Sequence, residues 1–441
     1  MGLDLNRNIY PWLYKLSFCL LFTFPALPNA LQSIVFGVFL ALCLANFFLR
    51  KQLLSFRLSD YISLFLLIAY YIFFLVTYLY PSRYSFSAEY IQPSLLLILC
   101  PLVMFLSNRE PDYKLDRLAI ILLTISSLWS FYLLYGYWTE GLALSYQYYR
   151  NDISFSDYGS IPDYRYVFKN SAEFLNSLAD WGFNKAGIKV ELNTHHTFLS
   201  AVYNFNIVLI LYTLNKRTNY LEKLFFIVGL LILIFFIYFL ESKVNILSAL
   251  IIICSSIILY IYRKLQQTQR YILGLIVFIG LFWGFYYLTN YQNKYSAIIE
   301  SKSFIEPQRK NLYSILLREL KLKPIFGYGA NNVKPIVDSI AKRDSSNYFY
   351  SFNVLTYVKS PHSQFLFSLL SGGAVQLTLF VAMFGFLGYI FFSRGNMFGL
   401  NFVFLVAMNC IFDDFLNRAW GVYLFTLGLI FFWSDIRRKV Q

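Results

Sequence analysis

The sequence predicts an all-α polytopic membrane protein with about twelve transmembrane helices and a helical cap outside the membrane. Three features of the composition predict this fold class. Of the 441 residues, 58% are apolar, 21% are aromatic and only 14% are charged. Soluble domains contain about 25% charged residues. One crossing of a bilayer needs about 20 apolar residues, so this chain holds enough apolar sequence for about twelve crossings.

Apolar runs between charged breaks define the expected spans. They lie near 11–27, 30–49, 58–80, 92–106, 117–138, 196–214, 221–240, 243–262, 271–290, 362–393, 397–412 and 420–434. An even number of spans places both ends of the chain on the same side. Basic residues are frequent at both ends and in the loops after even-numbered spans, whereas the opposite short loops carry only Arg83 and Arg418. The positive-inside rule therefore predicts that both termini are cytoplasmic.

The organisation expected from this pattern is a single membrane domain, 1–441, with two long external connections at 139–195 and 291–361. The first is rich in tyrosine and is typical of a loop that lies on lipid headgroups. The second contains eleven Lys and Arg residues against five Asp and Glu residues, a net charge of +6. A basic surface at membrane height suits a diphosphate or another anionic lipid headgroup, so the excess of basic residues does not indicate a nucleic-acid partner.

Several classes of function are disfavoured by missing patterns. The cysteines lie inside apolar runs without metal or disulfide spacing, which is typical of small core residues; they are Cys19, Cys43, Cys100, Cys254 and Cys410. Neither a phosphate-binding G-x-x-x-x-G-K-[ST] motif nor a zinc-binding H-E-x-x-H motif occurs, so we expect no metal and no cofactor. Acidic residues are almost absent from the spans, which disfavours a proton-coupled transporter.

The outer start of the tenth span carries the first candidate site. Pro361 at the first helical position would leave His362 and Ser363 in the first turn, where free N–H groups and the helix dipole attract anions. The dipole also favours a neutral imidazole that can accept a proton. Gly372 and Gly373, about three turns further on, are where the helix is expected to bend or to let a neighbour pack closely.

The second candidate lies in the basic loop, where an amphipathic helix is expected to begin at Arg309 and to stop at Pro324. Its apolar stripe comprises Leu312, Tyr313, Leu316, Leu317 and Leu320, and its basic residues lie mainly opposite, among them Lys310, Arg318, Lys321 and Lys323. Gly327 and Gly329 permit tight turns after the helix. Arg309 at the helix start is expected to hold a diphosphate with its guanidinium fork. The alternative is an interfacial helix whose basic side chains meet anionic lipid.

Three further groups lie beside outer loops. Lys243 begins the eighth span, and Glu241 two residues earlier would simply neutralise it if Lys243 has no functional role. The pair His195–His196 opens the sixth span, and the last outer loop carries Asp413, Asp414 and Arg418. Each of these groups is either part of a site or an anchor at the interface.

In their order and common outer placement, these motifs resemble the O-antigen ligase and O-antigen polymerase superfamily of bacterial envelope glycosyltransferases, over about 195–425. The resemblance rests on His362-Ser363 followed by nine residues and Gly373, on Arg309…Tyr313…Pro324-Ile325-Phe326-Gly327-Tyr328-Gly329, on Ser242-Lys243 and on His195-His196-Thr197-Phe198. Three positions depart from the family pattern: Lys243 replaces an arginine, Tyr313 a tryptophan and Gln376 a glycine. The lysine keeps a cation but loses the bidentate fork.

The resemblance implies a C-type glycosyltransferase-like fold and an inverting, metal-independent reaction without a cofactor. The donor would be a glycan linked to undecaprenyl diphosphate, and the acceptor a sugar of lipid A–core or of another glycan, at the periplasmic face of the inner membrane. Arg309 and Lys243 would stabilise the departing diphosphate, and His362 would orient or deprotonate the acceptor. Further diphosphate-binding residues would be Arg318 and Arg343, and the supporting residues Ser363, His195 and Gly373.

The motifs leave several functions open. A ligase that joins a polymer to lipid A–core is our first expectation, and a polymerase that joins repeat to repeat is the alternative in the same superfamily. Oligosaccharide transfer to protein is a third variant. From a different class, a transporter or flippase of lipid-linked sugars would need charged residues along a central path and related halves, and neither is clear in the sequence.

Overall fold

The computed structural model describes residues 4–27, 29–50, 58–80, 99, 113–149, 196–216, 219–240, 242–264, 313, 315–343, 361 and 363–438. Every element in these ranges is helical. The α-helices are α1 (Asp4–Leu21), α2 (Asn29–Arg50), α3 (Leu58–Tyr78), α5 (Tyr113–Tyr149), α7 (His196–Leu214), α8 (Tyr220–Phe239), α9 (Lys243–Lys264), α12 (Ala330–Arg343), α13 (Gln364–Ser393), α14 (Met397–Phe412) and α15 (Ala419–Arg438). Two short 3₁₀ turns, η1 (Phe24–Ala26) and η5 (Phe415–Asn417), follow α1 and α14.

The helices follow the predicted spans with some shifts. The first span is displaced toward the N-terminus as α1, and the fifth runs on to Tyr149 as α5 instead of ending at 138. The spans predicted at 92–106 and 271–290 fall outside the described residues, apart from Leu99.

Five described helices are long and apolar enough to cross a membrane; they cover 114–132, 197–214, 220–238, 364–393 and 419–436. Shorter apolar stretches of α1, α2, α3, α9 and α14 accompany them. An all-α chain with apolar, membrane-length helices is therefore confirmed for the described part, whereas twelve crossings are not.

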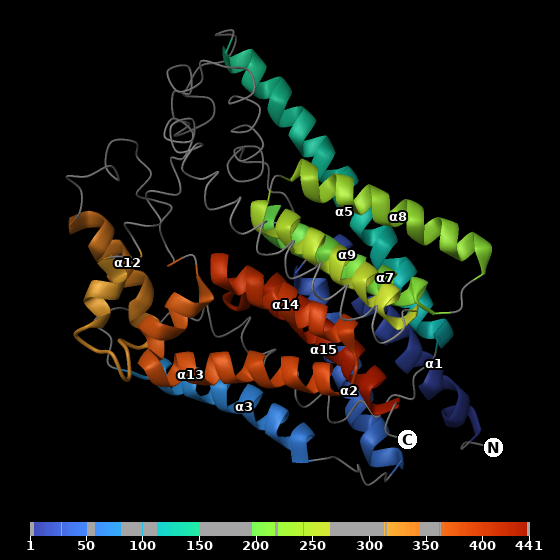
Figure 1. Cartoon of the computed structure of the whole chain (residues 1–441), viewed down its shortest axis with the longest axis horizontal. Helices are drawn as coiled ribbons and strands as arrows, with labels where there is room; N and C mark the ends of the chain where they lie inside the picture. The colour runs from blue at the N-terminus through green and yellow to red at the C-terminus, as the bar shows by residue number, and fades with distance from the viewer. Residues whose placement is uncertain are drawn as a thin grey trace.

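The helices form two neighbouring groups (Figure 1). Helices α3 and α13 lie side by side, and α12 contacts both of them at one end. Helices α7, α9 and α14 contact one another, and α8 covers the outside of α7. Helix α1 begins and α15 ends on the side of the molecule away from α12 (Figure 1). Within the region predicted to form the cap, the structure describes α12, which docks on the ends of α3 and α13, and helical residues at 315–320.

Burial separates central helices from peripheral ones. The side chains of α7 and α15 are mostly buried, while α8 leaves large apolar residues such as Leu231 and Phe235 exposed. An exposed apolar face on a membrane-length helix is suited to lipid. Among the described cysteines, Cys19, Cys43 and Cys410 are buried as predicted, but Cys254 on α9 is exposed, so its assignment to the core was wrong.

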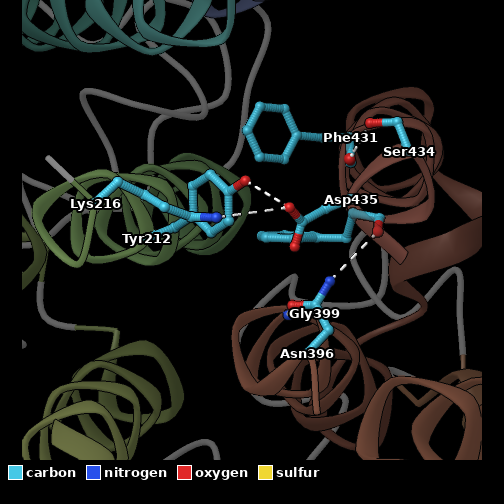
Figure 2. A network of polar contacts seen from close by, with 8 residues as sticks. Tyr212, Lys216, Asn396, Gly399, Phe431, Ser434 and Asp435 are labelled. Carbon is cyan, nitrogen blue, oxygen red and sulfur yellow. Dashed lines mark hydrogen bonds and ion pairs between the residues drawn. The ribbon is translucent and has the colours of Figure 1, made fainter. Parts of the chain in front are cut away.

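A polar network ties α7, α14 and α15 together at the end opposite α12 (Figure 2). The Tyr212 hydroxyl donates to Asp435 Oδ1 at 2.8 Å, and Lys216 Nζ lies 3.8 Å from the same oxygen. Asn396 caps α14 by accepting from the Gly399 N–H at 3.0 Å, and its amide donates to the Phe432 carbonyl of α15. A buried carboxylate is tolerated only when it is paired, and here it joins two helices. This network fixes one end of the bundle, and the candidate site lies at the other.

Candidate functional site

Helix α13 is broken at the glycine pair that the sequence singled out. Gly372 has φ −127° and ψ 15°, and Gly373 has φ 64° and ψ −156°, both outside the helical region. The conformation of Gly373 is essentially restricted to glycine. The break divides α13 into an outer segment, Gln364–Ser371, and a long segment, Ala374–Ser393. The predicted bend is confirmed.

The turn Pro324–Gly329 fills the break and pairs with its backbone. The N–H groups of Tyr328 and Gly329 donate to the carbonyls of Leu370 and Ser371 at 2.7 and 2.8 Å. In the other direction, the N–H groups of Ala374 and Val375 donate to the carbonyls of Pro324 and Ile325 at 2.8 and 3.3 Å. A helix break frees backbone groups that lipid cannot satisfy, so a partner segment must supply their hydrogen bonds. We call this pairing the α13 clasp.

Glycine makes the clasp possible because two backbones meet closely there. Gly327 has φ 63°, and a Cβ on it would lie 2.6 Å from both the Gly373 nitrogen and the Leu370 oxygen. A Cβ on Gly373 would meet the Phe326 nitrogen at 2.6 Å. Contacts this short do not occur in real structures, so neither position accepts a side chain without moving the turn away from α13.

The outer start of α13 differs from the prediction. Ser363 is the N-cap residue, with its Oγ accepting from the Leu366 N–H at 3.5 Å, and the helix begins at Gln364. Placing Pro361 at the first helical position and Ser363 within the first turn was therefore wrong. A serine hydroxyl satisfies an orphan N–H at the cap position, and this preference outweighs the preference of proline for the first helical position. His362 itself lies outside the described residues.

Gln364 joins this helix start to two other elements. Its N–H donates to the Asp413 carbonyl at 3.0 Å, which holds α13 against the loop after α14. Its side-chain amide donates to Asn417 Oδ1 at 3.1 Å and to the Tyr70 hydroxyl of α3 at 3.3 Å. Its carbonyl oxygen Oε1 accepts from the Leu416 N–H at 3.1 Å. Every polar group of this buried glutamine is thus used.

A cluster of three buried asparagines, Asn204, Asn245 and Asn409, joins α7, α9 and α14. Asn245 Oδ1 accepts from the amides of Asn204 and Asn409, both at 3.2 Å. The Asn245 amide donates to the Thr197 carbonyl at 3.0 Å and to Ser242 Oγ at 2.9 Å. Because Thr197 is in the first turn of α7 and Ser242 precedes α9, the cluster holds these two helix starts together.

The last outer loop closes the same region. Phe415 of η5 stacks on Phe198 of α7, with ring centroids 5.1 Å apart. Asp414 is fully buried, and its Oδ2 lies 3.7 Å from Nε of the half-exposed Arg418. The predicted acidic pair is therefore not a simple surface anchor, since Asp414 is buried inside the protein.

The helix starts that carry several of the predicted site residues thus lie close to one another in the structure. The starts of α7 and α13 both contact the 413–418 loop, and the start of α9 contacts the start of α7 through Asn245 and Thr197. The side chains of His196 and Lys243 are outside the described part, as are His195 and Arg309 entirely. Arg343 is the last residue of α12, and its side chain is likewise not described.

The described part of the basic segment agrees with the prediction in most respects. Helical residues run to Leu320, and the chain then turns before Pro324. Leu316 and Leu320 are buried, and Arg318 is exposed. Leu317, which the sequence places on the same apolar stripe, is 48% exposed. A leucine at membrane height can face lipid at no cost, and its apolarity therefore does not determine burial.

Sequence reasoning missed the neutral polar residues that organise the site. They are Tyr70, Asn204, Asn245, Gln364, Asn409 and Asn417. The sequence does contain a signal for them. An amide side chain inside an apolar run costs free energy unless it is hydrogen-bonded, so such a residue indicates a specific contact inside the protein. The sequence interpretation considered only charged residues and histidines as candidates, and so it missed these residues.

Part of the chain matches a known protein family. Residues 228–381 match a family described as O-antigen ligase. The matched region includes both halves of the α13 clasp and the start of α9. A search of curated proteins gives no significant match to the chain. The match supports glycan transfer of the ligase or polymerase type, and with the apolar helices it indicates a membrane protein. Residues 228–381 are thus similar to an O-antigen ligase domain, and this similarity supports the resemblance of the chain to the O-antigen ligase superfamily.

Proposed function

We propose that this chain transfers a glycan from undecaprenyl diphosphate onto an acceptor sugar at the periplasmic face of the inner membrane. The α13 clasp is the observation that carries the proposal. It holds the end of the basic segment against the helix that begins beside His362. The two stretches of sequence that resemble the family's motifs are therefore joined in space, although residues 330–361 separate them along the chain.

The height of the clasp in the membrane supports this role. The long segment of α13, Ala374–Ser393, is about 30 Å long at 1.5 Å per residue, which equals the thickness of the hydrocarbon core. Its inner end is marked by Arg394, so the clasp would lie at the outer boundary of that core. Helix α14, which follows, is about 24 Å long, so Asp413 would lie at nearly the same height. A lipid-linked diphosphate has its anionic group in this layer.

The chemistry needs cations for the leaving group and a base for the acceptor. Arg309 and Lys243 would bind the diphosphate, with Arg318 and Arg343 nearby in the sequence as further cations. His362 would take the proton from the acceptor hydroxyl as its oxygen bonds to the anomeric carbon. The bond from that carbon to the diphosphate oxygen breaks, and undecaprenyl diphosphate leaves with the electron pair, its charge balanced by the cations. Ser363, His195 and Gly373 would support this site.

The acceptor decides between the ligase and the polymerase. A deletion strain would be complemented with the wild type, with His362→Ala or with Ser255→Ala. Ser255 donates to Asn401 between α9 and α14, away from the site, and serves as the control. The surface glycan would be read on a lipopolysaccharide gel together with the undecaprenyl-linked pool.

Each outcome of this experiment has a distinct meaning. Bare lipid A–core with polymer accumulating on undecaprenol in the deletion strain identifies a ligase, and core bearing one repeat unit identifies a polymerase. His362→Ala is expected to reproduce the deletion, and Ser255→Ala is expected to restore the full ladder. A full ladder with His362→Ala, at a normal protein level, would contradict the catalytic assignment and bring a transport role forward.

A further inference from the structure

Gln364 has an unusual concentration of hydrogen bonds for a residue within an apolar stretch. It is 1% exposed, and its four bonds reach α3, η5 and the residue that ends α14. Gln364 therefore connects three elements at a single point. Because Gln364 follows His362 by two residues in the sequence, this junction lies beside the candidate site.

The orientation of the amide is fixed by its partners. The Leu416 N–H can only be met by an oxygen, so Oε1 must face Leu416 and the NH₂ group must face Tyr70 and Asn417. The Tyr70 hydroxyl, having accepted from Gln364, lies 3.2 Å from Ser368 Oγ one turn further along α13. The outer segment of α13 is therefore held at two successive turns by one chain of bonds: Asn417, Gln364, Tyr70 and Ser368.

An apolar side chain of the same volume cannot replace Gln364, because it cannot form the hydrogen bonds of the amide. A side chain of the same volume without an amide would leave the Leu416 N–H and Asn417 Oδ1 buried without these partners. Buried polar groups without hydrogen bonds cost free energy, so the 413–417 turn would shift relative to α13 until these groups are hydrogen-bonded again. The start of α13 would then move with respect to α3 and to the 413–417 turn.

We propose that Gln364 is a positioning residue for the transfer reaction: its amide ties the outer start of α13 to α3 and to the 413–417 turn, and so sets the place of the His362–Ser363 pair that precedes it. This inference rests on the proposed function. Gln364 acts through its neighbours and does not contact the reacting atoms.

The first test is kinetic and uses Gln364→Met, which keeps the volume and removes the amide. The full-length protein would be assayed in detergent, with the undecaprenyl-linked glycan pool from the deletion strain as donor. Both lipid A–core and the pool itself would be offered as acceptors. Because misplacement of a reacting group by about 1 Å costs on the order of 10²-fold in rate, kcat is expected to fall by that factor. KM is expected to change by no more than about threefold, since ground-state binding is kept.

A matched control separates positioning from general stability. Gln32 on α2 is also a buried glutamine, with its amide donating to the carbonyls of Phe24 and Leu27 at 2.9 and 2.7 Å. Gln32→Met loses the same chemistry away from α13 and is expected to keep kcat. In addition, the double variant Gln364→Met/Asn417→Ala is expected to match Gln364→Met within about twofold, because the two residues act through one bond network.

The second test does not depend on activity. The chain has three histidines, His195, His196 and His362. The rate at which diethyl pyrocarbonate modifies the peptide with His362 would be measured by mass spectrometry. Gln364→Met is expected to change this rate several-fold and to leave the His195–His196 peptide unchanged, whereas Gln32→Met is expected to change neither.

The two tests together distinguish the possible failures. A changed modification rate with an unchanged kcat would mean that Gln364 sets the place of His362 but that His362 does not act in the transfer, which would overturn both the proposed catalytic role of His362 and the role of Gln364 in the reaction. An unchanged modification rate, or equal losses of kcat in Gln364→Met and Gln32→Met, would overturn the positioning role.

Discussion

Replacing Gly373 by alanine is expected to open the α13 clasp. The backbone at Gly373 has φ 64° and ψ −156°, a region that costs a residue with a side chain about 1–3 kcal/mol. The new Cβ would also meet the Ile325 carbonyl and, at 2.6 Å, the Phe326 nitrogen. Moving the turn away would break the bonds from Ala374 and Val375, worth about 1 kcal/mol each. The total loss is expected to be about 3–5 kcal/mol.

The same helix offers a control for this experiment. A Cβ on Gly385, also in α13, would meet nothing within 4 Å. Gly385→Ala is expected to be neutral or to stabilise the helix by up to about 1 kcal/mol. Thermal unfolding in detergent would report the stability of each variant, and limited proteolysis would report cleavage within Pro324–Gly329. If Gly373→Ala were as stable as Gly385→Ala and as resistant to cleavage, the clasp would not have the role assigned to it.

Three further predictions concern other parts of the bundle. Asn245→Ala removes the centre of the asparagine cluster and is expected to destabilise the protein by about 2 kcal/mol in thermal unfolding, whereas an unchanged stability would mean that the cluster does not hold α7, α9 and α14. Tyr212→Phe removes a hydrogen bond to a buried carboxylate and is expected to lower the free energy of unfolding by about 1.5–3 kcal/mol. Thermal unfolding would measure this loss, with the exposed Tyr238→Phe as the control. A smaller loss for Tyr212→Phe than for Tyr238→Phe would contradict the network of Figure 2. Lys243→Ala is expected to lower the transfer rate on the order of 10²-fold and Lys243→Arg to retain it, and equal rates for the two variants would remove Lys243 from the diphosphate site.

Much of the fold could be predicted because the helices depend on local sequence. The bounds of α7 and α8 follow apolar runs closely, and the break in α13 follows from two adjacent glycines. The start of α13 was predicted incorrectly because two local rules compete there, and the serine cap outweighs proline. The difference at this helix start is only a few residues.

Burial was harder to predict than helix position, for a reason specific to membranes. In water an apolar side chain gains from burial, but in a bilayer it can face lipid equally well. The exposed Cys254 was assigned to the core because it lies inside an apolar run. Neutral polar residues are the better guide to the interior, since Asn204 and Gln364 must find partners inside the protein.

The candidate site could be predicted only in part because its assembly is non-local. The sequence indicated the turn at Pro324–Gly329 and the break at Gly372–Gly373 separately. It could not indicate that the backbone of one satisfies the other, since such pairing depends on three-dimensional contact. The role of Gln364 is hidden for the same reason, because its partners lie on α3 and on η5.

The central claim is that the chain itself catalyses glycan transfer with His362 as the base. The most direct measurement is the formation of transferred product by the purified full-length protein in detergent, with the undecaprenyl-linked glycan pool and a defined acceptor. Detergent removes the two sides of the membrane, so a transporter could form no product. The account predicts product with the wild type and loss of it with His362→Ala. No product from the wild type, or an equal rate from His362→Ala, would contradict it.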